Sequence, residues 1–190
     1  MNPSTGNQSS SSSGVLEIDD AIVLLLGAPG LTEQDRGRME GITRLEKLLF
    51  LLEKETDATS WLKEDAGFSS NNFGPFSAKA YQEIEMLTSA GLVEDSAKLT
   101  DSAEDTWETE NIIGEKPADP YATRDLSLTD KGSRYYKALL SELPEGAEGV
   151  VGELKRRFGS MPLRRLIRYV YQRYPDFTDK SIIRDEILGT

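Results

Sequence analysis

The 190-residue chain contains neither cysteine nor histidine. Structural zinc sites and redox dithiols need cysteine, and Ser-His-Asp triads, Cys-His pairs and imidazole metal sites need histidine, so the sequence excludes all of them. Catalysis would have to rest on carboxylates with a hard cation, on lysine or on tyrosine. We expect no cofactor and no metal centre, and a carboxylate-metal enzyme stays as an open alternative.

Long apolar runs are missing as well. The longest, residues 22–26, is far shorter than the roughly 20 residues that a membrane-spanning helix needs. The N-terminus has neither the basic start nor the apolar core of a targeting signal. These features predict a cytoplasmic protein with no membrane partner, and the lack of disulfide-forming residues agrees with that compartment.

The composition, 37% hydrophobic and 29% charged, is typical of a globular protein with a sizeable core. Residues 1–14 are rich in Ser, Asn and Gly and predict a disordered tail. Helical spacing of apolar residues predicts one domain at 15–145 and a helical extension at 146–190 packed on it. The expected helices cover residues 19–26, 41–55, 60–66, 78–91, 130–143, 147–158, 162–174 and 178–188, with strands at 92–95 and 124–128 and a loop at 67–76.

Charge is divided unevenly along the chain, whose net charge is −11. An acidic wing loop is expected at 94–123, because residues 94–119 hold nine acidic side chains against two lysines. Residues 151–190 hold nine basic and five acidic side chains, which makes the C-terminal quarter a basic element on an acidic protein. Such acidity opposes strong non-specific binding to nucleic acid, and it is also found in proteins from salt-rich cytoplasm.

The expected order of three helices, a strand, a long loop, a second strand and a helix is that of a winged helix-turn-helix domain. Two segments carry this likeness, AKAYQEIEMLTSAGLVE at 78–94 and LSLTDKG at 126–132. Ser77 is the expected N-cap of the first helix and Gly91 its end, and Thr129 or Asp130 caps the helix after the second segment. We therefore expect a mainly α fold, a winged helix-turn-helix-like domain with a small β wing and a C-terminal helical extension.

Three further segments, KLLFLL at 47–52, FGPFS at 73–77 and YVYQRYPDF at 169–177, extend the likeness. Together the segments resemble the Panacea-domain proteins, which include SocA-like antitoxins and YwgA-like proteins of bacteria and archaea. The resemblance implies a non-enzymatic prokaryotic regulator or antitoxin-like adaptor. Its partners would be double-stranded DNA, a protein such as a toxin or a complex subunit, or both.

A DNA-binding role would use basic and amide side chains on the second and third helices, the wing and the C-terminal helices. The residues expected at the groove, the wing and the phosphates are Arg44, Lys47, Lys79, Gln82, Arg124, Arg156, Arg157, Arg164, Arg165 and Arg168. Two features oppose this role. The segment between the second and third helices is longer than the turn of a helix-turn-helix, and Glu83 and Glu85 would repel phosphates.

Each candidate site has a purely structural alternative. The basic C-terminal helices could be an ordinary solvated surface that pairs with the protein's own acids. Phe73 and Phe76 would form an apolar knob for a partner protein or, as we favour, pack inward as a hydrophobic staple on the next helix. The whole chain could also be a protein–protein interaction subunit with no nucleic-acid role, and its C-terminal helices could form a homodimer.

Overall fold

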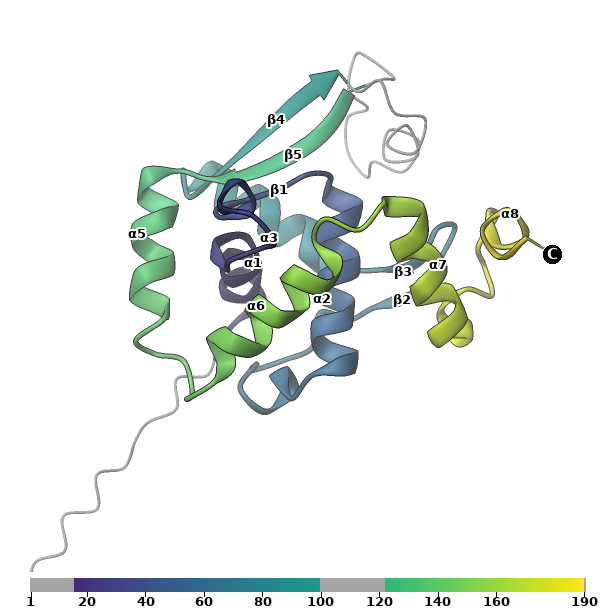
Figure 1. The fold of residues 1–190 in the computed structure, drawn as a ribbon, viewed down its shortest axis with the longest axis horizontal. Coiled ribbons are helices and arrows are strands. Elements are labelled where there is room, and N and C mark those ends of the chain that lie inside the picture. Colours follow the sequence, from purple (N-terminus) through teal and green to yellow (C-terminus); the bar gives the residue numbers. More distant parts are fainter. Residues whose placement is uncertain (1–15, 100–121, 190) are drawn as a thin grey trace, which may run out of the picture.

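The computed structural model describes residues 16–99 and 122–189 and shows a mainly helical fold with a small antiparallel sheet (Figure 1). The predicted tail at 1–14 and most of the predicted acidic loop lie outside the described residues. The helices are α1 (Ile18–Gly27), α2 (Ile42–Glu55), α3 (Ala78–Ser89), α5 (Asp130–Leu139), α6 (Ala147–Phe158), α7 (Leu163–Arg173) and α8 (Arg184–Leu188). The strands are β1 (Arg38–Met39), β2 (Ser69–Asn71), β3 (Gly74–Phe76), β4 (Val93–Leu99) and β5 (Ala122–Leu128).

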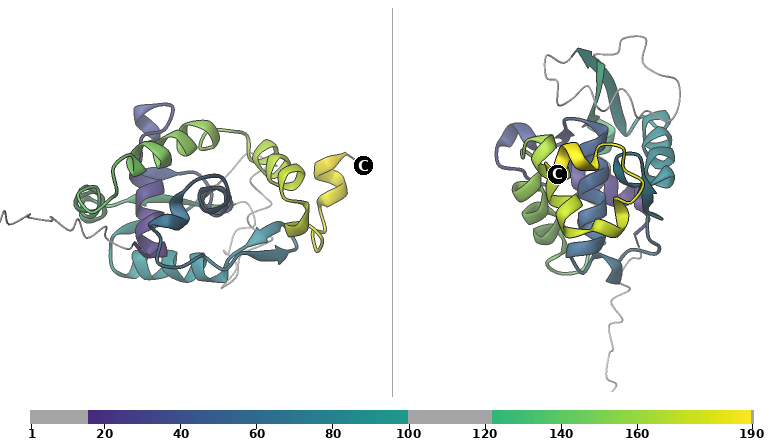
Figure 2. Two further views of the ribbon diagram at one scale, coloured as in Figure 1. Left: turned by 90° about the horizontal axis from the view of Figure 1, so that it is seen from below. Right: turned by 90° about the vertical axis from the view of Figure 1, so that its right-hand side faces the viewer.

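Two helices, α1 and α2, form the centre of the molecule. α3 covers one side of them and α6 the opposite side, while α5 packs against α1 and α7 against α2 (Figure 2). Nine of the ten residues of α1 are buried. The unbroken apolar run at 22–26 accounts for this, because a helix that is apolar all round must be covered on every face.

The three-stranded sheet places β5 between β1 and β4, with all neighbours antiparallel. β4 and β5 pair from Val93 opposite Leu128 to Leu99 opposite Ala122, and they project from the helical body (Figure 1). The sequence predicts both strands but makes them shorter, because the apolar signal stops before the backbone ladder does. β1 escapes prediction, since two residues are too few for a periodic pattern.

The segment predicted as a short helix at 60–66 is not helical. A 3-10 turn at Ala58–Ser60 leads into it, and Leu62 then forms a parallel bridge with Leu16. Trp61 and Leu62 are buried and anchor this segment to the core. The Leu16 backbone also accepts and donates hydrogen bonds here, so pairing with the chain before α1 overrides the local helical pattern.

The segment predicted as a loop at 67–76 contains the β2–β3 hairpin, with Ser69 opposite Phe76. Gly74 has a φ of 91°, and a Cβ at this position would stand 2.6 Å from the Tyr171 ring on α7. The hairpin therefore depends on close packing against a helix far along the chain. Its own sequence indicates only turn residues, which explains why the prediction missed it.

The C-terminal helices agree with the sequence to different degrees. α6 has the predicted bounds, and α7 lacks only the two end positions of the predicted 162–174. α5 ends at Leu139 rather than at 143, and α8 covers only the end of the predicted 178–188. All of these helices contribute side chains to the same hydrophobic cluster as α1 and α2.

Candidate functional site

Lys47 is buried, which contradicts its expected role as a contact to DNA. Its side chain is 2% exposed, and Nζ donates to Glu46 Oε2 at 2.8 Å and to the Pro75 carbonyl oxygen at 2.6 Å. Glu46 Oε1 in turn accepts a hydrogen bond from the Ser77 amide at 3.0 Å. An ammonium group held in this way cannot reach a phosphate, so Lys47 leaves the set of candidate DNA contacts.

Arg44 points into the protein for the same reason, because tertiary packing closes over the start of α2. Its residue exposure is 9%, its Nε donates to the Glu40 carbonyl oxygen at 3.0 Å, and one terminal nitrogen donates to the Met161 carbonyl oxygen. These bonds join the start of α2 to the connection between α6 and α7. The guanidinium therefore borders a polar cavity instead of the expected DNA groove.

The predicted recognition helix, α3, has an acidic setting. Lys79, its only lysine, pairs with Glu64 at 2.5 Å. Burial and the nearby carboxylate of Asp19 raise the pKa of Glu83 on the same helix. A phosphate approaching this part of α3 would meet carboxylates, and the one cation is already paired.

The outward face of α3 is polar with one large apolar side chain. Gln82 is exposed, as predicted, and shares a helical face with Met86, which is 59% exposed. Glu85, next to Met86, is exposed as well. Sequence reasoning listed Gln82 but missed Met86, because a methionine near the end of an amphipathic helix is more often part of the core.

Arg124, expected on the wing, is engaged by the neighbouring strand. Its Nε and Nη2 donate to Asp95 Oδ2 at 2.7 and 2.5 Å. Both side chains are mostly covered, with 17% and 14% exposure. The pair links β5 to β4, so its first role is to hold the two strands together.

The arginines of the C-terminal helices are largely engaged within the protein. The contacts are Arg156 with Glu153 at 3.3 Å, Arg157 with Glu55 at 3.8 Å, Arg164 with Glu186 at 3.0 Å, and Arg168 Nε with the Ile187 carbonyl oxygen at 2.6 Å. Arg165 is exposed and has no such partner among the described residues. The structure thus brings Arg164 and Arg168 together at α8. It agrees with the alternative that the basic side chains of these helices pair with the protein's own acidic side chains.

The two aromatic residues of the predicted partner-binding turn lie on the β2–β3 hairpin and its end. Phe76 packs on Tyr81, with ring centroids 5.3 Å apart. Between them Ser77 caps α3, as predicted, by accepting a hydrogen bond from the Ala80 amide at 3.0 Å. Phe76 therefore forms the favoured hydrophobic staple, while Phe73 is half-buried at the hairpin turn.

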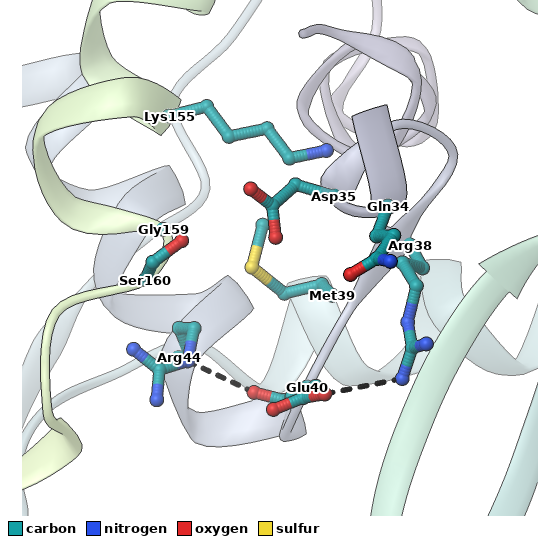
Figure 3. Close-up of a pocket in the computed structure, with 9 residues that line it drawn as sticks. All are labelled: Gln34, Asp35, Arg38, Met39, Glu40, Arg44, Lys155, Gly159 and Ser160. Atoms are coloured by element: carbon teal, nitrogen blue, oxygen red, sulfur yellow. Dashed lines mark hydrogen bonds and ion pairs between the residues drawn. The ribbon is translucent and has the colours of Figure 1, made fainter. Parts of the chain in front are cut away.

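A polar cavity of about 230 Å³ lies between β1 and the C-terminal end of α6 (Figure 3). It is lined by Gln34, Asp35, Arg38, Met39, Glu40, Arg44, Lys155, Gly159 and Ser160. Sequence reasoning missed this site because its residues come from two stretches far apart in the chain, 34–44 and 155–160. The one local signal is Lys155, which interrupts the apolar stripe of α6 between Val151 and Phe158 and is only 1% exposed.

Two further properties concern residues 16–99 and 122–189 alone. Each helix in these ranges is too short or too polar to cross a lipid bilayer. No group of three or more acidic side chains there is arranged to hold a metal ion. Comparison of the chain with protein-family models, with curated proteins and with solved structures found no match.

Proposed function

We propose that the protein is the binding module of a prokaryotic regulator or antitoxin-like adaptor, and that α3 contacts a partner protein. The resemblance of its sequence to Panacea-domain proteins suggests this class. The observation that carries the proposal is the outward face of α3. Met86 is exposed there among polar and acidic side chains, and the only lysine of the helix is already paired.

The order of the elements supports a winged-helix interpretation. α1, β1, α2 and α3 precede β4 and β5, and the sheet order β1-β5-β4 puts β5 in the middle. In this interpretation α3 is the recognition helix and the β4–β5 pair is the wing. The β2–β3 hairpin separates α2 from α3 where a helix-turn-helix has a short turn, which favours a use of α3 other than reading a DNA groove.

The partner that suits this face is a protein with an apolar pocket surrounded by basic groups. Met86 offers a large, flexible apolar side chain that adapts to such a pocket. Gln82 and Glu85 beside it supply acceptors for hydrogen bonds from the basic rim. The net charge of −11 would also attract a basic partner and speed its association.

Double-stranded DNA is the second candidate, and Arg165 is the observation that favours it. This arginine is exposed on α7, and Arg164 and Arg168 lie within one turn of it. Both neighbouring arginines donate hydrogen bonds to α8, Arg164 to the Glu186 carboxylate and Arg168 to the Ile187 carbonyl oxygen. A phosphate would compete with those contacts. One exposed arginine supports a weak, salt-sensitive contact rather than a specific site.

Affinity capture from the native host, followed by titration of the purified partner, tests the protein-partner proposal. We expect Met86→Glu to weaken partner binding about tenfold or more, because it places a charge in the apolar contact. Ile182→Glu is the matched control, since Ile182 is an equally large exposed residue, 71% exposed, away from α3. Equal binding by the wild type and Met86→Glu would remove α3 from the interface.

Fluorescence anisotropy with DNA tests the second candidate. The duplexes come from the region upstream of the protein's own gene, with scrambled controls, at two salt concentrations. We expect no sequence-dependent binding. Tight, sequence-dependent binding that Gln82→Ala weakens would overturn the protein-partner proposal in favour of a DNA-binding regulator.

A further inference from the structure

We propose that the cavity between β1 and the end of α6 binds a hydrogen phosphate group, whose oxygens accept hydrogen bonds from Lys155 and whose hydroxyl donates to Asp35 (Figure 3). This site lies on the α6 side of the central helices, whereas α3 covers the opposite side (Figure 2). The inference therefore does not depend on the proposed function of α3.

Lys155 is the first reason for a ligand with oxygen acceptors. Its ammonium group has three protons, and the structure gives it one acceptor among the described residues, the Leu26 carbonyl oxygen at 2.5 Å. The side chain is 1% exposed, and buried polar groups in proteins are almost always satisfied. The two remaining protons are free to donate to oxygen atoms of a group bound in the cavity.

Asp35 is the reason for a ligand that also carries a proton. It interacts electrostatically with Lys155, and Figure 3 shows its carboxylate beside the Lys155 side chain, although the two form no salt bridge within the described part of the chain. Burial opposes ionisation of Asp35, but hydrogen bonds from Thr32 outweigh it and hold the pKa of the carboxyl below its usual value. A carboxylate accepts hydrogen bonds and repels an anion that has no proton to donate. It therefore favours an anion that carries a hydroxyl group.

The charge of the cavity fits an anion as well. Arg38, Arg44 and Lys155 line it together with two acids, Asp35 and Glu40, which leaves an excess of one positive charge on a protein of net charge −11. Arg38 pairs with Glu40 at 3.2 Å and so offsets that carboxylate. The remaining balance favours a single anionic group placed next to Lys155.

Size and protonation agree with phosphate. A volume of about 230 Å³ is several times the share of one water molecule, about 30 Å³, and lies below the usual range for drug-sized ligands. Burial lowers the pKa of Lys155 to about 8, so the side chain is still mostly protonated at neutral pH. Inorganic phosphate keeps at least one proton near pH 7, while sulfate keeps none, so Asp35 should distinguish the two.

Thermal unfolding of the full chain in phosphate and in sulfate at equal ionic strength tests the proposal. Both salts stabilise proteins generally, so sulfate corrects for that effect. We expect phosphate to raise Tm by about 4 °C more than sulfate when its concentration is about ten times Kd. Glycerol phosphate in a third sample shows whether a phosphate ester is accepted in place of the free ion.

Variants of Lys155 and Asp35 distinguish binding of phosphate in the cavity from a general effect of the salt on stability. Lys155→Met should lose the phosphate-specific shift without unfolding, because the Leu26 carbonyl oxygen still accepts from the Gly37 amide at 2.9 Å. Asp35→Asn should bind sulfate and phosphate alike, since its amide can donate to either anion. Arg156→Met, the exposed neighbour of Lys155, and Met86→Glu on α3 should both keep the wild-type shift. A wild type without any phosphate-specific shift, or a Lys155→Met protein that keeps it in full, would overturn the proposal.

Discussion

At the scale of single residues, the interior of this protein contains charged side chains that are paired with each other and hydrogen-bonded to the backbone. Lys47 and Glu46 form a buried ion pair on α2, and together they bind the Pro75 carbonyl oxygen and the Ser77 amide. Removing two charges from water is costly, so the pair adds little net stability. Its effect is positional, because it holds the end of the β2–β3 hairpin and the start of α3 against α2.

Replacing Lys47 alone should destabilise the protein strongly. We expect Lys47→Met to lower the free energy of unfolding by about 3–5 kcal/mol, because Glu46 would remain buried without its cation. The double variant Lys47→Met, Glu46→Gln should recover much of this loss, since glutamine is uncharged and still accepts from the Ser77 amide. Urea denaturation measures all three proteins. Lys137→Met, at an exposed lysine of α5, is the control and should change stability by no more than about 0.5 kcal/mol.

A double variant as unstable as Lys47→Met would contradict this account. In that case the lost stability would come from the packing of the lysine stem and its bond to Pro75 rather than from the uncompensated charge of Glu46. The size of the coupling between the two positions therefore decides between the two causes.

At the scale of elements, local signals place the helix starts and distant contacts place the irregular segments. Ser77 caps α3 and Thr129 caps α5. In each case the side-chain oxygen accepts a hydrogen bond from a backbone amide in the first turn of the helix. Both caps follow from sequence, because a cap involves residues only three positions apart. The β2–β3 hairpin does not, because Gly74 at the start of β3 packs against Tyr171 on α7.

Two glycines at the same position in the first turn of their helices should respond differently to alanine. In α5, a Cβ on Gly132 would overlap the Leu92 carbonyl oxygen, which accepts from Thr129 where β4 begins. We expect Gly132→Ala to cost about 1–3 kcal/mol, because the first turn of α5 must move away from β4. In α6, Gly149 has open space, so Gly149→Ala should be neutral or stabilising by up to about 1 kcal/mol.

Chemical denaturation of the two alanine variants under identical conditions makes the comparison. Both replacements add one methyl group to a helix, so helix propensity cancels between them and the difference reports the close approach of α5 to Leu92. Equal stability of Gly132→Ala and Gly149→Ala would show that the two elements can separate freely, contrary to the structure.

At the scale of the whole molecule, one aromatic cluster joins the C-terminal helices to the rest. The Phe50 ring of α2 makes edge contacts with Phe68, Tyr174 and Phe177, at centroid distances of 5.1, 5.0 and 5.0 Å. Phe50 is fully buried. Residues from both ends of the described chain therefore share one core, and they should unfold together.

Calorimetry tests this shared core. We expect a single unfolding transition in the wild type and in Phe50→Ala, with Tm lowered by about 10 °C in the variant, because losing a buried phenylalanine costs about 3–5 kcal/mol. Phe73→Ala, at the half-buried residue of the hairpin turn, is the control and should lower Tm much less. Two separate transitions would mean that the C-terminal helices form a unit of their own.

The sequence by itself determined most of the helices, the two long strands, the caps and the buried nature of α1. These features follow from residues within a few positions of one another, through periodicity, capping and turn chemistry. It also favoured inward packing of Phe73 and Phe76 as a staple on α3 over contact with a partner, since the two positions of a staple lie close in sequence.

Only the tertiary structure decided where the charges lie. Helical periodicity tells which face of α2 carries Arg44 and Lys47, but it does not tell that Met161 and Pro75 lie opposite them. A lysine is usually exposed, and it is buried only when a distant carbonyl or carboxylate meets it. The cavity around Lys155 arose in the same way, because its walls come from segments that meet only after the chain has folded.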